Sequence, residues 1–172
     1  KPSLEVEAAN FITEGFETAD KALAGACEIL IEAFSEDNQL RSWVYNEIWS
    51  YSSIISIVKD EAADDNKTFQ IYYDFSEKVS KIQGYRILAL NRGEKLGILK
   101  VGFEHNIDKM VRFMGARFKN KNAYIDDVIA KTIKKKIVPA MERRVHSELT
   151  ESAEDGAIEL FSENLRNLLL VS

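Results

Sequence analysis

The sequence predicts an all-α protein, a multihelical array of about seven to nine helices that ends in a long C-terminal helix. Only two prolines and eight glycines occur among 172 residues. Apolar residues recur at three- and four-residue spacing through nearly the whole chain, which is the period of an amphipathic helix. We expect at most one short strand, near 98–103, where the run ILKVGF has strand-like residues.

Two helices are expected at the N-terminal end. The first, over 19–34, carries an apolar stripe for about four turns after Thr18, a suitable N-cap. The second has its apolar face over 40–58, with a break near 51–53. Its cap is one of three residues, Ser35, Asp37 or Asn38.

The middle of the chain mixes polar connections with short helices. KDEAADDNK, at 59–67, is a polar connection, and FQIYYDFSE, at 69–77, is expected to form a short aromatic-rich helix. A further helix is predicted from Ile82 to Arg92. It would end with Gly93 in the left-handed conformation, so that Arg92 lies near the negative end of the helix dipole.

Three more helices are predicted in the second half of the sequence. One follows Asn106, another follows Asn122 and runs to Ile137, and a third begins at Pro139, where a missing N–H is harmless. From there apolar residues recur every four residues for about thirty residues. A single long helix fits this pattern, and two helices joined near 149–151 are the alternative.

Charge divides the chain into segments. Residues 1–77 carry 5 basic and 16 acidic side chains, and residues 78–144 carry 17 basic and 6 acidic. We therefore predict an acidic helical subdomain over 1–58, a connection at 59–67, a basic helical subdomain over 68–138, and the long helix over 139–172.

No enzyme motif is found. Three residues separate Gly93 from Gly97 and no Lys-Ser/Thr follows, so the segment is not a nucleotide-binding P-loop. His105 and His146 lack zinc-site spacing, and a Ser/His/Asp set can be picked from any chain this rich in serine. The expectation is a non-enzymatic protein without metal or cofactor.

Composition favours a cytoplasmic protein. Cys27 is the single cysteine, so no disulfide framework forms, and no run approaches the length of a membrane helix. The chain begins at Lys1 and stops at an apolar end, which suggests a fragment of a larger protein.

The basic segment predicts sequence-independent contacts with the phosphates of RNA or DNA. A solvated helix face is the alternative on charge alone. The candidate residues are Arg86, Arg92, Lys95, Arg112, Arg117, Lys119, Lys131, Lys134 and Lys135.

Two segments carry a resemblance to a known family. YDFSEKVSKIQGYRILALNRGEKLGILKV and VPAMERRVHSELTESAEDGAIELFSENLRNLLL resemble the Tex family of bacterial transcription accessory proteins, in the helical region just before the YqgF domain. Tyr85 departs from the family pattern, which commonly has histidine there, whereas Arg86 and the segment 92–94 match it.

The resemblance implies a multihelical region with a helix-turn-helix element, followed by YqgF, helix-hairpin-helix and OB-fold RNA-binding domains that this chain lacks. It implies a nucleic-acid-binding factor that acts around transcription, with the transcription or translation machinery among its partners. The alternative is a structural scaffold that positions those domains and binds no nucleic acid itself. In that case the basic segment docks on an acidic surface, such as the N-terminal segment of the same chain.

Overall fold

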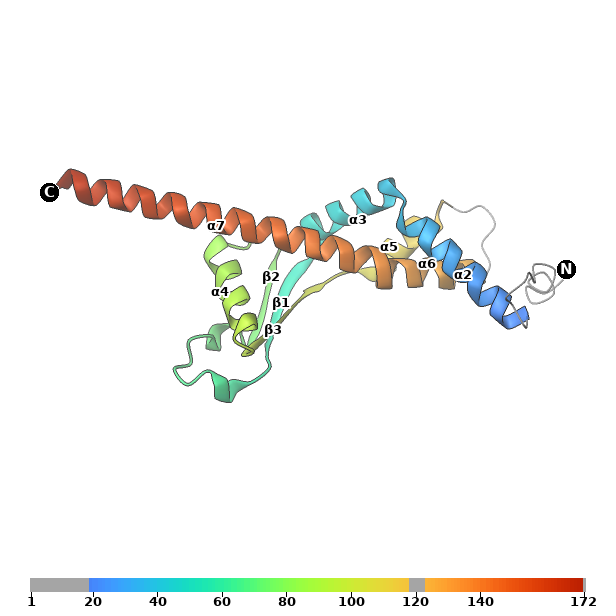
Figure 1. Ribbon diagram of the computed structural model, residues 1–172, viewed down its shortest axis with the longest axis horizontal. Helices are drawn as coiled ribbons and strands as arrows, with labels where there is room; N and C mark the ends of the chain where they lie inside the picture. The colour runs from blue at the N-terminus through green and yellow to red at the C-terminus, as the bar shows by residue number, and fades with distance from the viewer. Residues whose placement is uncertain (1–18, 118–122, 172) are drawn as a thin grey trace. The chain divides into compact units, whose positions relative to one another are not determined.

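The computed structural model describes residues 19–117 and 123–171, and helices make up most of them (Figure 1). The helices and strands are α2 (Ala19–Ser35), α3 (Asn38–Tyr51), β1 (Ser53–Val58), β2 (Asp74–Lys78), α4 (Gly84–Lys95), β3 (Leu99–Glu104), α5 (Ile107–Gly115), α6 (Ala123–Thr132) and α7 (Val138–Val171). Two 3-10 turns, η1 (Glu61–Ala63) and η2 (Gln70–Tyr72), and a π-helical turn, η3 (Ile133–Ile137), complete the described chain. The prediction of a mainly helical protein is confirmed, although the helices of the described residues, α2 to α7, are fewer than the seven to nine expected.

A three-stranded antiparallel sheet corrects the expectation of at most one strand. The strand order is β2-β1-β3, with Ser53 of the central strand paired to Lys78 on one side and to Glu104 on the other. The predicted second helix ends at Tyr51, and the SIISIV run of β1 follows. β-Branched isoleucine and valine pack well on a pleated surface, which favours the strand over a continued helix.

The segment 69–77 is also not the expected aromatic helix. Only one 3-10 turn, η2, forms there, and β2 follows directly. Along β2 the half-buried residues Phe75 and Glu77 alternate with exposed ones, which is the period of two that a strand imposes. Sequence spacing alone did not separate this short alternation from a helical turn.

The described chain forms two compact units. Unit 1 combines residues up to Ser42 with Ile107–Pro139. In it α2 packs against α6, and α5 contacts both α6 and η3. Its buried apolar side chains include Leu40, Met110, Met114, Val128, Ile129, Ile133 and Ile137.

Unit 2 combines Trp43–Asn106 with the chain from Ala140 onward. It contains the sheet, helix α4 and most of α7. Its core includes Val44, Ile48, Ile54, Phe69, Val79, Ile87, Leu90, Leu99, Met141 and Val145. Each unit combines two segments that are not contiguous in the sequence. The predicted division of the chain into an acidic subdomain, a connection, a basic subdomain and a long helix therefore stays a prediction.

Helix α7 runs without a break from Val138 to Val171, and the two-helix alternative is excluded. Pro139 stands in its first turn, but α7 follows η3 and α6 without a non-helical residue, so no separate helix begins at Pro139. Its buried residues are four apart, from Met141 to Ala153, and every described residue after Ala153 is exposed. Within the described ranges, no helix is both long enough and apolar enough to cross a membrane.

Candidate nucleic-acid interface

The end of α4 places Arg92 and Lys95 on the surface of unit 2. Both side chains are exposed in the last turn of the helix, where a positive charge meets the negative end of the helix dipole. Helix α4 runs to Lys95 and does not end at Gly93. The left-handed residue is Gly97, with φ of 76°.

The hydrogen bonds at this end form a Schellman motif. The Ile98 N–H donates to the Gly93 carbonyl at 3.0 Å, and the Gly97 N–H donates to the Glu94 carbonyl at 3.0 Å. The predicted glycine-capped end is therefore present, but four residues later than expected. Gly93 itself lies buried inside the helix, where a Cβ would stand 2.5 Å from Leu99 Cδ1.

Arg86 is held within the fold of unit 2. Its Nη1 lies 3.3 Å from the Glu77 carboxylate, its Nε donates to the Tyr85 hydroxyl at 3.0 Å, and its guanidinium lies over the ring of Phe75. The hydrogen bond to Tyr85 is the main cause that raises the pKa of Arg86. With a carboxylate and two aromatic rings as neighbours, Arg86 has a structural role in addition to any contact with a phosphate.

Unit 1 holds the remaining described candidates, and two of them are paired. Arg117 lies 3.2 Å from Asp37 and donates to Gln39 at 2.8 Å. Lys131 lies 2.7 Å from Asp127, one turn earlier on α6, and this hydrogen bond raises the pKa of Lys131. These pairs lower the positive charge that the two side chains present to solvent.

Three candidates of unit 1 form no ion pair with any other described residue. Arg112 is exposed in the last turn of α5, and Lys134 and Lys135 are exposed in η3. Helix α5 and η3 pack against each other, so these cations belong to neighbouring elements. Lys119 lies outside the described residues.

Sequence reasoning omitted the third lysine of η3. Lys136 is exposed beside Lys134 and Lys135, with its Nζ 3.9 Å from Glu32 of α2. The run of three consecutive lysines in the sequence could have indicated that Lys136 belongs with the other candidate residues. The candidates thus form a group of three on α4 and a group on α5, η3 and their neighbours in unit 1.

A buried polar chain in unit 2 was not predicted either. Ser52 Oγ lies 2.7 Å from His105 Nδ1, and His105 Nε2 donates to the Glu142 carboxylate. The His105 side chain is 4% exposed and stacks on Phe103. Because Ser52 is also buried, its hydroxyl is not open to a substrate, and the contacts join the ends of α3 and β3 to α7.

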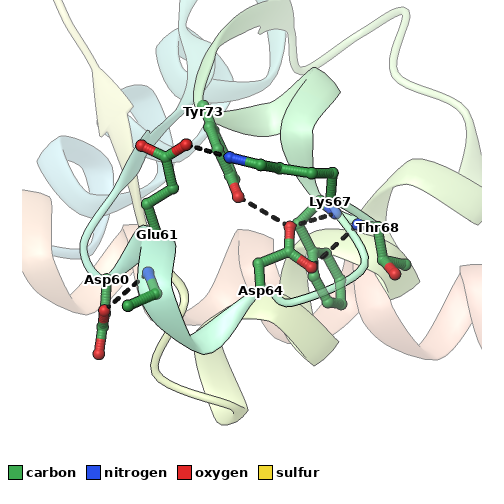
Figure 2. A network of polar contacts seen from close by, with 8 residues as sticks. Asp60, Glu61, Asp64, Lys67, Thr68 and Tyr73 are labelled. Atoms are coloured by element: carbon green, nitrogen blue, oxygen red, sulfur yellow. Dashed lines mark hydrogen bonds and ion pairs between the residues drawn. The ribbon is translucent and has the colours of Figure 1, made fainter.

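A second buried polar centre organises the 59–67 segment. Asp64 accepts hydrogen bonds from the N–H groups of Thr68 and Phe69 and from the Tyr73 hydroxyl, at 2.8 to 2.9 Å (Figure 2). Burial by itself raises the pKa of Asp64. The three hydrogen bonds together lower the pKa by more than burial raises it, so the pKa lies below its ordinary value. Burial and the bond to Asp64 raise the pKa of Tyr73 to about 12. The polar segment is therefore a structured loop.

Polar residues of α4 and α7 also meet in unit 2. The Asn91 amide donates to Thr150 Oγ1 at 2.9 Å and accepts from His146 Nε2 at 2.7 Å. They line an open hollow with Arg143, an exposed cation outside the predicted set. Among the described residues, no three histidine, cysteine or carboxylate side chains are grouped as a metal site would require.

Comparison with known proteins identifies the family. Residues 2–161 match the family described as Tex central region-like. The Bacillus subtilis (strain 168) protein YdcI is 35% identical over 97% of this chain and 24% of its own length. The transcriptional accessory protein Tex of Neisseria gonorrhoeae is 28% identical over 98% of this chain and 24% of its own length.

A human relative extends the similarity. The S1 RNA-binding domain-containing protein 1 of Homo sapiens is 26% identical over 92% of this chain and 18% of its own length. The chain thus spans about a quarter of the bacterial relatives that it matches. The match over residues 2–161 covers most of the chain and agrees with the resemblance carried by the segments around α4 and α7. The chain therefore belongs to the Tex central region-like family.

Proposed function

We propose that this chain is a non-enzymatic, nucleic-acid-binding region of a Tex-like transcription accessory factor, which contacts phosphates without reading sequence. The observation that supports it best is the set of exposed cations Arg112, Lys134 and Lys135 in unit 1. They lie on packed neighbouring elements and form no ion pair with another described residue. Arg92 and Lys95 add an exposed pair in unit 2.

The relatives support the same proposal. One is named a transcriptional accessory protein and another an S1 RNA-binding domain-containing protein. In the full-length protein, phosphate contacts from this region would add affinity to that of dedicated RNA-binding domains. They would carry no sequence information. The helix-turn-helix element, a cytoplasmic location and a transcription or translation partner stay predictions.

A scaffold role is the second candidate, and specific contacts favour it. The ion pairs Arg117–Asp37 and Lys136–Glu32 join the basic segment to the acidic N-terminal segment within unit 1. Part of the positive charge is thus neutralised by the chain itself. In this role the region would hold other domains in place and bind no nucleic acid.

Salt titration of binding separates the two roles. The chain would be titrated with fluorescein-labelled mixed-sequence duplex DNA, duplex RNA and single-stranded RNA, and anisotropy would be recorded at several salt concentrations. Phosphate contact predicts that log K falls linearly with log salt, with a slope of about 0.9 per duplex phosphate contacted. Absence of binding at low salt would leave the scaffold role.

Charge-reversal variants locate the contacts. The triple variant Arg112→Glu, Lys134→Glu, Lys135→Glu is expected to reduce the duplex salt slope by about 2 to 3. A control of equal charge change reverses Lys59, Lys81 and Arg166, which are exposed cations outside the predicted set. If the control weakens binding as much as the triple variant, the contacts are not localised to α5 and η3.

A further inference from the structure

The π-helical turn η3 interrupts an otherwise α-helical run from α6 into α7. The Val138 N–H donates to the Ile133 carbonyl, five residues back, whereas an α-helix bonds residues that are four apart. The turn therefore holds about one residue more than an α-helical turn. Single π-turns of this kind are rare, and they occur frequently at functional sites.

The burial of side chains along the helix shows the same insertion. The buried pairs 128–129 and 132–133 are four residues apart, but the next buried pair, 137–138, follows after five. Met141, which is also buried, then lies four residues after the start of that pair. The extra residue lies between the pairs 132–133 and 137–138, where the sequence has only Lys134, Lys135 and Lys136.

The insertion decides the direction of Lys136. In an unbroken α-helix, at about 100° per residue, Lys136 would lie about 40° from the buried Thr132 and so on the buried side of the helix. Val138 would lie about 240° from Thr132, on the opposite side. In the structure Val138 is buried and the Lys136 side chain is 52% exposed. The π-turn therefore directs all three lysines outward.

Pro139 explains the place of the wide turn but not the inserted residue. In a regular α-helix the proline ring clashes with the carbonyl four residues earlier, here that of Lys135, so a proline favours a wider turn just before it. A proline kink by itself leaves the four-residue spacing of buried positions unchanged. The extra residue is a lysine and is exposed, so it adds charge and no buried surface.

The surroundings of the turn add another cation and one weak ion pair. Arg112 is exposed at the end of α5, which packs against η3. Lys136 Nζ lies 3.9 Å from the carboxylate of Glu32, and both side chains are more than half exposed. An exposed pair at this distance contributes little to stability. A phosphate can therefore replace Glu32 as the partner of Lys136.

We propose that this π-turn is a binding site for nucleic-acid phosphates, in which the inserted residue directs Lys136 outward to join Lys134, Lys135 and Arg112. The inference rests on the proposed function and narrows it, because it assigns the phosphate contacts of unit 1 to one turn and adds Lys136 to them. The lysine ammonium groups act as point charges on neighbouring phosphates and read no base.

Neutral substitution measures the contribution of Lys136. Anisotropy titrations with fluorescein-labelled mixed-sequence duplex DNA give a salt slope for each variant, and Lys136→Gln is expected to reduce that slope by about 1. The control Lys81→Gln changes an exposed lysine of unit 2 and should leave the slope unchanged. An unchanged slope for Lys136→Gln, in a chain that binds duplex, overturns this inference and leaves the proposed function standing. A chain that binds no duplex at low salt contradicts the proposed function itself.

Deletion of Lys135 tests whether the extra residue serves binding or packing. The deletion is made in a Pro139→Ala chain, since a proline inside a regular α-helix destabilises it. It restores the four-residue spacing of buried side chains and leaves two lysines in the turn. Compared with Pro139→Ala alone, the salt slope should be smaller by about 1 and the unfolding temperature, measured by circular dichroism, should be no lower. A large fall in that temperature would show that the turn is needed for packing, and an unchanged slope would show that it is not needed for binding. Either result overturns the inference.

Discussion

At the residue scale, Asp64 shows how one buried carboxylate organises a loop that reads as a polar connection in the sequence. It accepts three hydrogen bonds, from Thr68, Phe69 and Tyr73, and these tie the segment before η2 to the residues that lead into β2. The backbone near it includes Lys67 with φ of 52°, a conformation that non-glycine residues rarely adopt. The network gives the loop a defined structure that composition alone did not predict.

The pKa of Asp64 predicts a dependence of stability on pH. Because the folded state lowers the pKa below its ordinary value of 3.8, this carboxylate stabilises the fold above that pH. The contribution is lost as the pH falls through the folded-state pKa. Asp64→Asn, which cannot ionise and turns its N–H₂ group toward one of the two backbone N–H donors, should lower the urea midpoint at about pH 7 and reduce its further fall at about pH 3.

Asp65→Asn is the matched control, since Asp65 is exposed in the same loop. It should leave the urea midpoint unchanged at both pH values. An Asp64→Asn protein whose midpoint equals that of the parent at neutral pH would show that the network does not stabilise the fold.

Two helical glycines make opposite predictions for substitution by alanine. At Gly93 a Cβ would stand 2.5 Å from Leu99 Cδ1 and 3.0 Å from Phe69 Cδ1, and both side chains are buried. Gly93→Ala should therefore destabilise the chain by about 1 to 3 kcal/mol. At Gly156 no described atom beyond the adjacent residues and nearby backbone of α7 lies within 4 Å of the Cβ position, so Gly156→Ala should stabilise the chain by about 0.5 to 1 kcal/mol through helix propensity.

Urea unfolding of both variants measures these effects. The two substitutions add the same methyl group to helices of the same unit, so the difference between them reports local packing. If Gly93→Ala were more stable than the parent, Leu99 and Phe69 would have to move aside readily. The close approach of α4 and β3 would then not be what requires glycine at this position.

At the element scale, His105 connects three elements of unit 2. Its ring contacts Ser52 after α3, Glu142 of α7 and Phe103 of β3. These elements are distant in sequence, and a buried hydrogen-bonded ring fixes how they pack. The arrangement resembles a catalytic set only in composition, because the serine hydroxyl is buried.

His105→Ala should lower the free energy of unfolding by about 2 to 4 kcal/mol, since it removes two hydrogen bonds and leaves a cavity against Phe103. Glu142→Ala removes only one hydrogen bond, from a carboxylate that is 30% exposed, and should cost about 1 kcal/mol. Urea unfolding of the two variants measures both values. Equal losses would indicate that the hydrogen bond to Glu142 and not the packing of the ring holds the elements together.

At the scale of the whole molecule, charge and packing follow different divisions. The sequence separates an acidic first part from a basic second part, yet each compact unit contains segments of both. Unit 1 uses Asp37 and Glu32 from the acidic part to pair with Arg117 and Lys136 from the basic part. Only part of the positive charge counted along the chain therefore remains available to a phosphate.

The sequence by itself determined the helical class, the ends of several helices and the family. Helical periodicity predicted α2, α4, α5 and α7, the break at Tyr51 was anticipated, and the Leu99–Glu104 strand lies where a strand was expected. These features depend on local spacing and turn chemistry, which neighbouring residues supply.

Only the tertiary structure decided the sheet, the roles of the candidate cations and the position of the buried polar groups. Strands β1 and β2 are short and satisfy their hydrogen bonds through partners far along the chain, so local spacing could not distinguish them from helical turns. Likewise, Arg86 and Arg92 look alike in sequence. One is held by Glu77 and aromatic rings while the other is exposed, because burial and ion pairing depend on what the fold brings beside each side chain.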